Sequence, residues 1–185
     1  MIQKLFTFFL FFQFLFVFSQ DSDKKIFKNP YKWKNEIIDF PVKWAPKFNL
    51  RGHEEILFSP NWSKPENPQF WTLLIAWEIT TEEKIGLNEI RKNLFGYFDG
   101  LMKPNHWSKE FPEPVLNLEL KKEGFFGKMT FFDGFHTGKM VTVNIIGNQI
   151  VKKKDNVAII YFKLSPKEIN HVIWKKLNTI EILDQ

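Results

Sequence analysis

The pattern of apolar and polar residues in the second half of the chain predicts four strands. The alternation over 116–121 is typical of a strand with one face in water, and a tight turn at 122–124 makes it a hairpin with the next strand. A long apolar run follows the lysine-rich tip at 152–154, which indicates a strand covered on both faces. The four strands are expected over 116–121, 125–132, 139–146 and 157–164.

Two segments carry helix start signals. Thr80 followed by Glu83 fits a capping box, and apolar residues then recur at helical spacing from Leu87 to Leu101. Ser165-Pro166-Lys167-Glu168 is the second signal, with Ser as N-cap, Pro at the first helical position and Glu at the third. Two earlier strands are expected over 55–58 and 70–78.

This order of elements predicts an α+β fold. Two strands, a long helix, four meandering strands and a final helix favour an antiparallel sheet that covers the long helix. From 70 to 164 the order resembles the cystatin-like arrangement of one strand, one helix and four further strands. The resemblance concerns element order alone, so it implies no function.

The first residues have the pattern of a secretory signal peptide. Lys4 precedes an apolar run over 5–18, and the run is too short to span a bilayer. We expect cleavage near Ser19, export to the periplasm or the extracellular space, and no transmembrane segment afterwards. Residues 20–185 are expected to form a single domain, of which 20–28 are flexible.

Composition narrows the classes of function. The chain of 185 residues has no Cys, which excludes disulfides, thiol catalysis and Cys-ligated zinc. Its net charge of +5 is small and scattered, so nucleic acid is not an expected partner. No phosphate-binding loop, zinc signature or EF-hand spacing occurs, and no cofactor or metal is expected.

An aromatic stretch punctuated by proline is the first candidate site. Trp44, Trp62 and Trp71 offer flat faces for a glycan, an apolar small molecule or an envelope protein, with Trp107 at the edge of the groove. The alternative interpretation is that these rings fasten an irregular segment onto the sheet. The stretch 40–71 resembles an uncharacterised group of secreted bacterial proteins, and this resemblance implies export but no activity.

A loop between two strands is the second candidate. Asp133 and His136 lie in it, and a carboxylate can orient an imidazole as a general base, with Asp99 or His106 completing the site. The alternative is a turn in which Asp133 accepts local backbone hydrogen bonds. His53-Glu54-Glu55 lacks metal-binding spacing and is expected at the surface or in a loop.

The sequence therefore favours a small exported binding or interaction module over an enzyme. An acid/base hydrolase that uses Asp133 and His136 is the first alternative, and a structural subunit of an envelope assembly is the second. Gly96 and Gly100 leave one side of the long helix flat, which predicts close packing against an aromatic ring such as Trp77 or access for a ligand.

Overall fold

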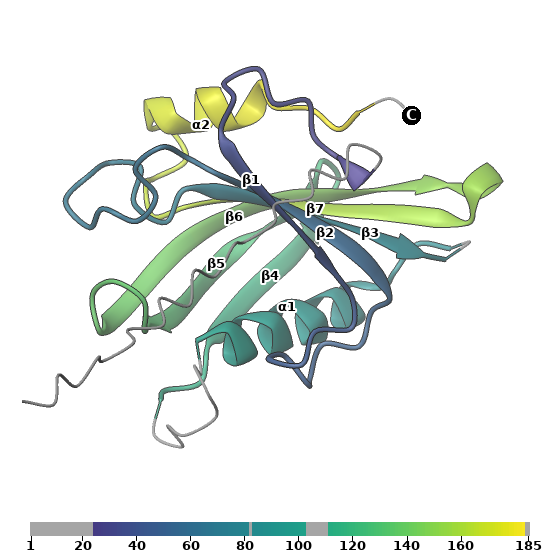
Figure 1. Ribbon diagram of the computed structural model, residues 1–185, viewed down its shortest axis with the longest axis horizontal. Helices are drawn as coiled ribbons and strands as arrows, with labels where there is room; N and C mark the ends of the chain where they lie inside the picture. Colours follow the sequence, from purple (N-terminus) through teal and green to yellow (C-terminus); the bar gives the residue numbers. More distant parts are fainter. Residues whose placement is uncertain (1–23, 82, 103–110, 184–185) are drawn as a thin grey trace, which may run out of the picture.

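One antiparallel sheet of seven strands organises the protein (Figure 1). The computed structural model describes residues 24–81, 83–102 and 111–183, so the predicted signal peptide lies outside the described residues. The sheet has the order β1-β2-β3-β7-β6-β5-β4. The elements are β1 (Lys34–Asp39), β2 (Gly52–Phe58), β3 (Leu73–Thr80), α1 (Leu87–Leu101), β4 (Val115–Lys121), β5 (Gly124–Asp133), β6 (Lys139–Lys152), a short 3₁₀ turn (Lys153–Asp155), β7 (Val157–Ser165) and α2 (Val172–Asn178).

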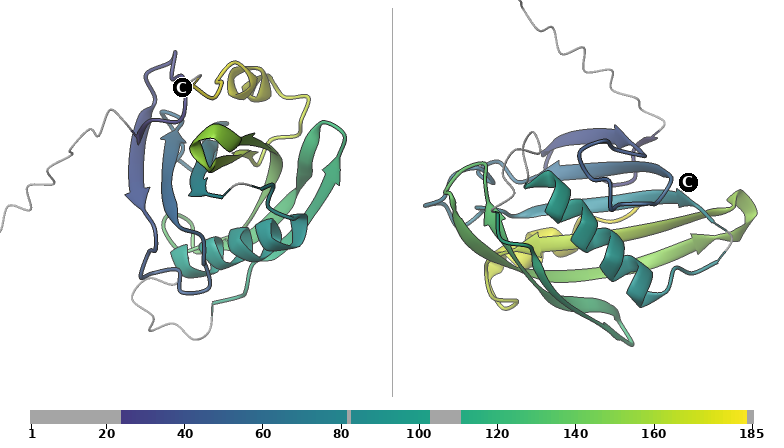
Figure 2. Two further views of the ribbon diagram at one scale, coloured as in Figure 1. Left: turned by 90° about the vertical axis from the view of Figure 1, so that its right-hand side faces the viewer. Right: turned by 90° about the horizontal axis from the view of Figure 1, so that it is seen from below.

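The two helices lie on opposite faces of the curved sheet. Figure 2 shows α1 in the hollow of the sheet and α2 on the other side. Each face has its own apolar core: Trp77 and Phe162 lie on the α1 face, whereas Leu74 and Trp174 lie on the α2 face. Alternate residues of β3 thus enter different cores, as the twofold repeat of a strand requires.

The predicted fold class is confirmed. The structure is α+β, with a helix packed on an antiparallel meander and a second helix near the C-terminus. All four strands predicted in the second half of the chain are present, and β3, α1 and β4 to β7 follow the expected cystatin-like order. The lysine-rich tip is the turn between β6 and β7.

The predicted start of the long helix is wrong. Thr80 is the last residue of β3 and pairs with Val157, so it does not cap a helix. α1 begins at Leu87, and its N-cap is Gly86, which has no side chain to accept a hydrogen bond. The Thr81 hydroxyl instead accepts a hydrogen bond from the Glu83 N–H at 3.2 Å, a local turn.

The predicted start of the last helix is also wrong. Ser165 is the last residue of β7, and a hydrogen bond of 2.9 Å joins its hydroxyl to the Thr72 hydroxyl. α2 begins only at Val172, where the His171 ring accepts a hydrogen bond from the Ile173 N–H. The Pro166-containing segment is therefore a connection between β7 and α2.

The N-terminal part of the sheet departs from prediction. β1 is an edge strand that the sequence pattern missed, because only Ile37 and Ile38 are apolar among its six residues. β2 begins three residues earlier than expected, at Gly52, and β3 begins at Leu73 instead of residue 70. Residues 24–28, expected to be flexible, pack on the α2 face of β2, here called the outer face, with Ile26 and Phe27 buried.

The two glycines of α1 contact backbone. A Cβ atom on Gly96 would lie 2.9 Å from the carbonyl carbon of Lys47, and one on Gly100 would lie 2.5 Å from the Cα of Ala45. The Asn93 side chain secures the same segment by accepting a hydrogen bond from the Asn49 N–H at 2.8 Å. The flat side of α1 thus accommodates the β1–β2 connection, and the expected aromatic neighbour is not what the glycines approach most closely.

Replacing Gly100 with alanine should loosen this contact. The added methyl group overlaps backbone atoms that cannot rotate away, and overpacking costs about 1–3 kcal/mol, more than the helix propensity that alanine gains. Urea unfolding should show a loss of about 2 kcal/mol. Gly86→Ala is the matched control, because its methyl group would meet no atom within 4 Å, and it should cost less than about 1 kcal/mol. Equal losses in both variants would contradict the packing argument.

Candidate functional site

A cavity of about 320 Å³ lies between the sheet and the C-terminal half of α1. Its floor comes from the α1 face of β1, β2 and β3, and three of the four tryptophans singled out in the sequence contribute to its wall. The charged residues that line it, Lys34 and Glu36, are exposed and stand at its rim. The lining residues are Lys34, Glu36, Ile38, Trp44, Ile56, Phe58, Trp62, Trp71, Leu73, Ile75, Tyr97, Phe98, Leu101 and Phe135.

Trp44 reaches the cavity through the β1–β2 connection. The close approach of Gly100 to the backbone at Trp44 and Ala45 holds this segment on α1. The Trp44 ring meets the ring of Tyr97 edge-on, with centroids 5.0 Å apart. The glycines of the helix and the tryptophan of the loop therefore form one packed unit that closes one side of the cavity.

Trp62 and Trp71 come from the connection between β2 and β3, which is tightly hydrogen-bonded. The Trp71 N–H donates to the Trp62 carbonyl at 2.9 Å, and the Trp62 N–H donates to the Ser59 carbonyl at 3.0 Å. The Gln69 side chain accepts from the Asn61 N–H at 3.2 Å. These bonds bring the two indole rings to a centroid distance of 5.7 Å in an edge-on arrangement.

Trp71 has an unusual backbone conformation and an unpaired polar atom. Its φ angle of 47° lies in the left-handed region, which is uncommon for a bulky residue and marks a position held by its surroundings. The side chain is buried, and its indole N–H lacks a hydrogen-bond partner within the described part of the chain. A buried donor without a partner costs free energy, so the position of this ring must be stabilised by its other contacts.

The two candidate loops meet in space. The His136 ring packs edge-on against Trp62 at 5.0 Å and also contacts Phe70 and Trp71. Phe135, the preceding residue, lines the cavity and is 48% exposed. Loops far apart in the sequence thus form one aromatic cluster at the same end of the sheet.

The structure does not support the predicted interaction between Asp133 and the His136 ring. The Asp133 carboxylate accepts hydrogen bonds from the backbone N–H groups of Phe135, His136 and Thr137, and from the Thr137 hydroxyl. No hydrogen bond joins it to the imidazole, whose Nε2 is buried without a partner among the described residues. Asp133 therefore shapes the turn, which is the alternative that the sequence left open.

Asp99, a further candidate of the predicted catalytic group, lies away from the Asp133 loop and contacts Lys47. Asp99 is buried on α1 and pairs with Lys47 at 3.0 Å, and the hydrogen bond between them raises the pKa of Lys47. His106 and Trp107 fall outside the described residues. Asp99 consequently helps to hold the β1–β2 connection on α1.

The prediction that His53-Glu54-Glu55 lies at the surface is wrong. All three residues are buried in β2 and point alternately to the two faces of the sheet. His53 hydrogen-bonds to the Lys24 carbonyl at 2.9 Å, and Glu55 accepts from the N–H groups of Ile26 and Phe27. The burial arises because β2 lies inside the sheet and the N-terminal segment covers its outer face.

Glu54 faces the α1 core and is an unusual carboxyl group. Burial raises its pKa from the ordinary 4.5 to about 8, although the Tyr97 hydroxyl donates a hydrogen bond to it at 3.0 Å and lowers the pKa. The Trp77 indole also lowers the pKa without meeting hydrogen-bond geometry, and the charge of Glu36 raises it. Glu54 is thus predominantly protonated at neutral pH. Tyr97 connects it to the cavity wall.

Within the residues that the structure describes, no group of three or more acidic or histidine side chains is arranged to hold a metal ion. In the same part of the chain, no helix combines the length and apolar character needed to cross a membrane. No protein-family model, curated protein or solved structure matches the chain.

Proposed function

We propose that the protein is a small exported binding module that takes an apolar small molecule into the aromatic cavity. The observation that carries the proposal is the convergence of Trp44, Trp62 and Trp71 on one cavity of about 320 Å³. Ligand pockets of this size are lined mainly by apolar and aromatic side chains with a few polar groups that fix orientation. Here the charged side chains of the lining are Lys34 and Glu36, which stand at the rim.

An apolar ligand suits the cavity better than a glycan. A sugar ring needs several hydrogen-bond partners beside an aromatic face, and the charged side chains of the lining stand at the exposed rim. The inner wall consists of aliphatic and aromatic groups such as Ile56, Ile75 and Phe98. Burying polar hydroxyls against that wall would leave them without partners and would cost free energy.

The hydrolase alternative has less support. Its proposed base, His136, packs against aromatic rings, and the carboxylate expected to orient it is occupied by the backbone of the loop. Glu54 has a raised pKa but lies behind Tyr97 and does not line the cavity. These positions favour rigid support of the aromatic wall over proton transfer to a substrate.

Removing one aromatic side chain from the wall should weaken ligand binding. Phe135→Ala removes a half-exposed ring, so the fold should persist, whereas Trp62→Ala removes a larger and more buried contact. The probe is a series of straight-chain alcohols, followed by quenching of tryptophan fluorescence. We expect dissociation constants to rise about tenfold, equivalent to about 1.4 kcal/mol of lost contact.

Tyr31→Ala is the control, because Tyr31 is an exposed aromatic residue outside the cavity. Its affinity for the alcohols should equal that of the unmodified protein. Circular dichroism should show that Phe135→Ala remains folded. A failure of every alcohol to bind, or an equal loss of affinity in Tyr31→Ala and Phe135→Ala, would contradict the proposal.

A further inference from the structure

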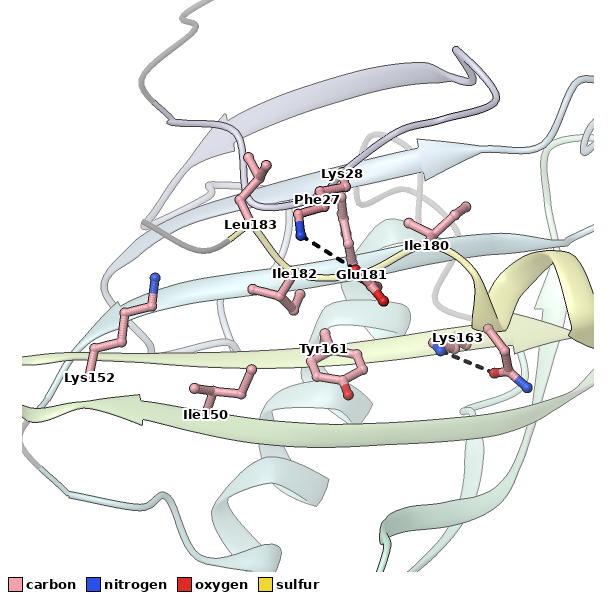
Figure 3. A pocket seen from close by; sticks show the side chains of 11 residues that line it. Phe27, Lys28, Ile150, Lys152, Tyr161, Lys163, Ile180, Glu181, Ile182 and Leu183 are labelled. Atoms are coloured by element: carbon pink, nitrogen blue, oxygen red, sulfur yellow. Dashed lines mark hydrogen bonds and ion pairs between the residues drawn. The ribbon is translucent and has the colours of Figure 1, made fainter.

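A second cavity, of about 600 Å³, lies on the opposite face of the sheet (Figure 3). Its floor is formed by Ile150 and Lys152 of β6 and by Tyr161 and Lys163 of β7. Its other wall is the C-terminal segment 180–183, which follows α2. This groove shares no residue with the aromatic cavity, so the two are separate sites.

The groove carries excess positive charge. Lys28 forms an ion pair with Glu181 at 3.4 Å, but neither Lys152 nor Lys163 forms an ion pair among the described residues. The Lys163 ammonium donates to the neutral Asn178 side chain at 3.1 Å. The Lys152 ammonium is buried and has no hydrogen-bond partner in the described part of the chain. A buried ammonium without a partner is costly, so an acidic group of a ligand would be favourable there.

The two lysines stand at opposite ends of the groove. Lys163 pairs with Ile146, and Lys152 lies six positions further along β6, so their Cα atoms are separated by about 20 Å at the rise of a strand. Between them the floor presents Ile150, which is 40% exposed, and the half-buried ring of Tyr161. Burial against this apolar floor lowers the pKa of Lys163, although the charge of Glu181 in the same groove raises it.

The C-terminal segment offers backbone groups to a bound chain. Its pairing with the N-terminal segment is antiparallel, with the Lys28 N–H donating to the Glu181 carbonyl and the Leu183 N–H donating to the Ile26 carbonyl, both at 2.8 Å. In such a pair, the N–H and C=O groups of Ile182 point away from Phe27, its bridge partner. A second extended chain can use these groups as it would use the edge of a sheet.

We propose that this groove binds an extended peptide segment of a partner protein, with two acidic side chains about six residues apart and apolar residues between them. The acidic groups would pair with Lys152 and Lys163, and the apolar residues would cover Ile150 and Tyr161. Charge complementarity and the length of the groove both select an elongated anionic chain. The backbone groups of Ile182 have no hydrogen-bond partner among the described residues, which favours a peptide over a lipid anion.

Synthetic peptides test this proposal through their spacing of charge. Each labelled peptide carries two aspartates on either side of an alternating valine and threonine stretch, and the spacing varies from about three to about nine residues. Fluorescence anisotropy with the full protein should show the tightest binding at about six residues. Lys152→Met and Lys163→Met should each weaken that peptide about tenfold, the loss expected for one charge-assisted hydrogen bond.

Lys154→Met is the matched control, since Lys154 is exposed in the turn beyond Lys152 and the change in net charge is the same. The affinity of Lys154→Met for the peptide should be unchanged, and Lys152→Arg should still bind the peptide. The proposal is overturned if no peptide binds, if affinity does not depend on spacing, or if Lys154→Met loses as much affinity as Lys152→Met. Phe135→Ala should leave peptide binding intact, which separates this site from the aromatic cavity.

Discussion

Glu54→Gln should stabilise the protein at alkaline pH and have little effect at pH 5. In the folded protein burial raises the pKa of Glu54 to about 8, whereas the unfolded chain ionises near 4.5. Between these values the folded state binds more protons than the unfolded state, so the free energy of unfolding falls as the pH rises. Each pH unit corresponds to about 1.4 kcal/mol, so the loss across the window from pH 4.5 to about 8 is on the order of 5 kcal/mol. Glutamine keeps an acceptor for Tyr97 and has no charge to lose.

Urea unfolding at pH 5 and pH 9 measures this effect as a difference between proteins. The unmodified protein and Glu54→Gln should have similar free energies of unfolding at pH 5, where the carboxyl group is neutral in the folded state. At pH 9 the variant should be more stable by several kcal/mol. Glu119→Gln, at an exposed position on β4, should have the same free energy of unfolding as the unmodified protein at both pH values. A stability difference that is the same at pH 5 and pH 9 would show that Glu54 is not held neutral.

The fold could be predicted wherever neighbouring residues in the sequence determine it. Alternation in β4 to β6 and the apolar run of β7 are local patterns, and the hairpins between these strands need only short turns. The ends of strands depend on distant partners instead. Thr80 remains in β3 because Val157 lies opposite it, and Ser165 remains in β7 because Asn144 lies opposite it. A capping signal of four residues contains no information on these ladder partners.

The aromatic residues of the candidate site could be predicted from the sequence, but the contacts between them could not. Trp62 and Trp71 stand out in the sequence because large aromatic residues in a loop punctuated by proline need a partner surface. The contact of Trp62 with His136 depends on the sheet bringing two loops to the same end. The burial of Glu54 was equally hidden, since nothing nearby in the sequence shows that Tyr97 and Trp77 surround it. Whether the cavity binds a ligand stays a prediction.

Glu54 and Glu55 are consecutive buried carboxyl groups of β2, and their surroundings differ. Glu54 points into the aromatic core with one hydrogen bond from Tyr97, and its pKa rises. Glu55 points to the other face, where its oxygens accept hydrogen bonds from Ile26, Phe27 and the Asn35 side chain at 2.6, 2.8 and 3.2 Å. Burial of the Glu54 carboxyl group therefore costs electrostatic free energy, whereas the Glu55 carboxylate holds the N-terminal segment on β2.

Glu55→Ala should therefore be among the most destabilising single substitutions on the outer face. It removes the acceptor for two buried backbone N–H groups, and each unpaired donor costs about 1–3 kcal/mol. We expect urea unfolding to report a loss of about 3–5 kcal/mol. Hydrogen exchange of the Ile26 and Phe27 amides should accelerate together. Glu55→Gln retains one acceptor oxygen and should lose less, and the exposed Glu119→Ala should stay within about 0.5 kcal/mol of the unmodified protein. If Glu55→Ala unfolds like Glu119→Ala, the N-terminal segment is not held by this carboxylate.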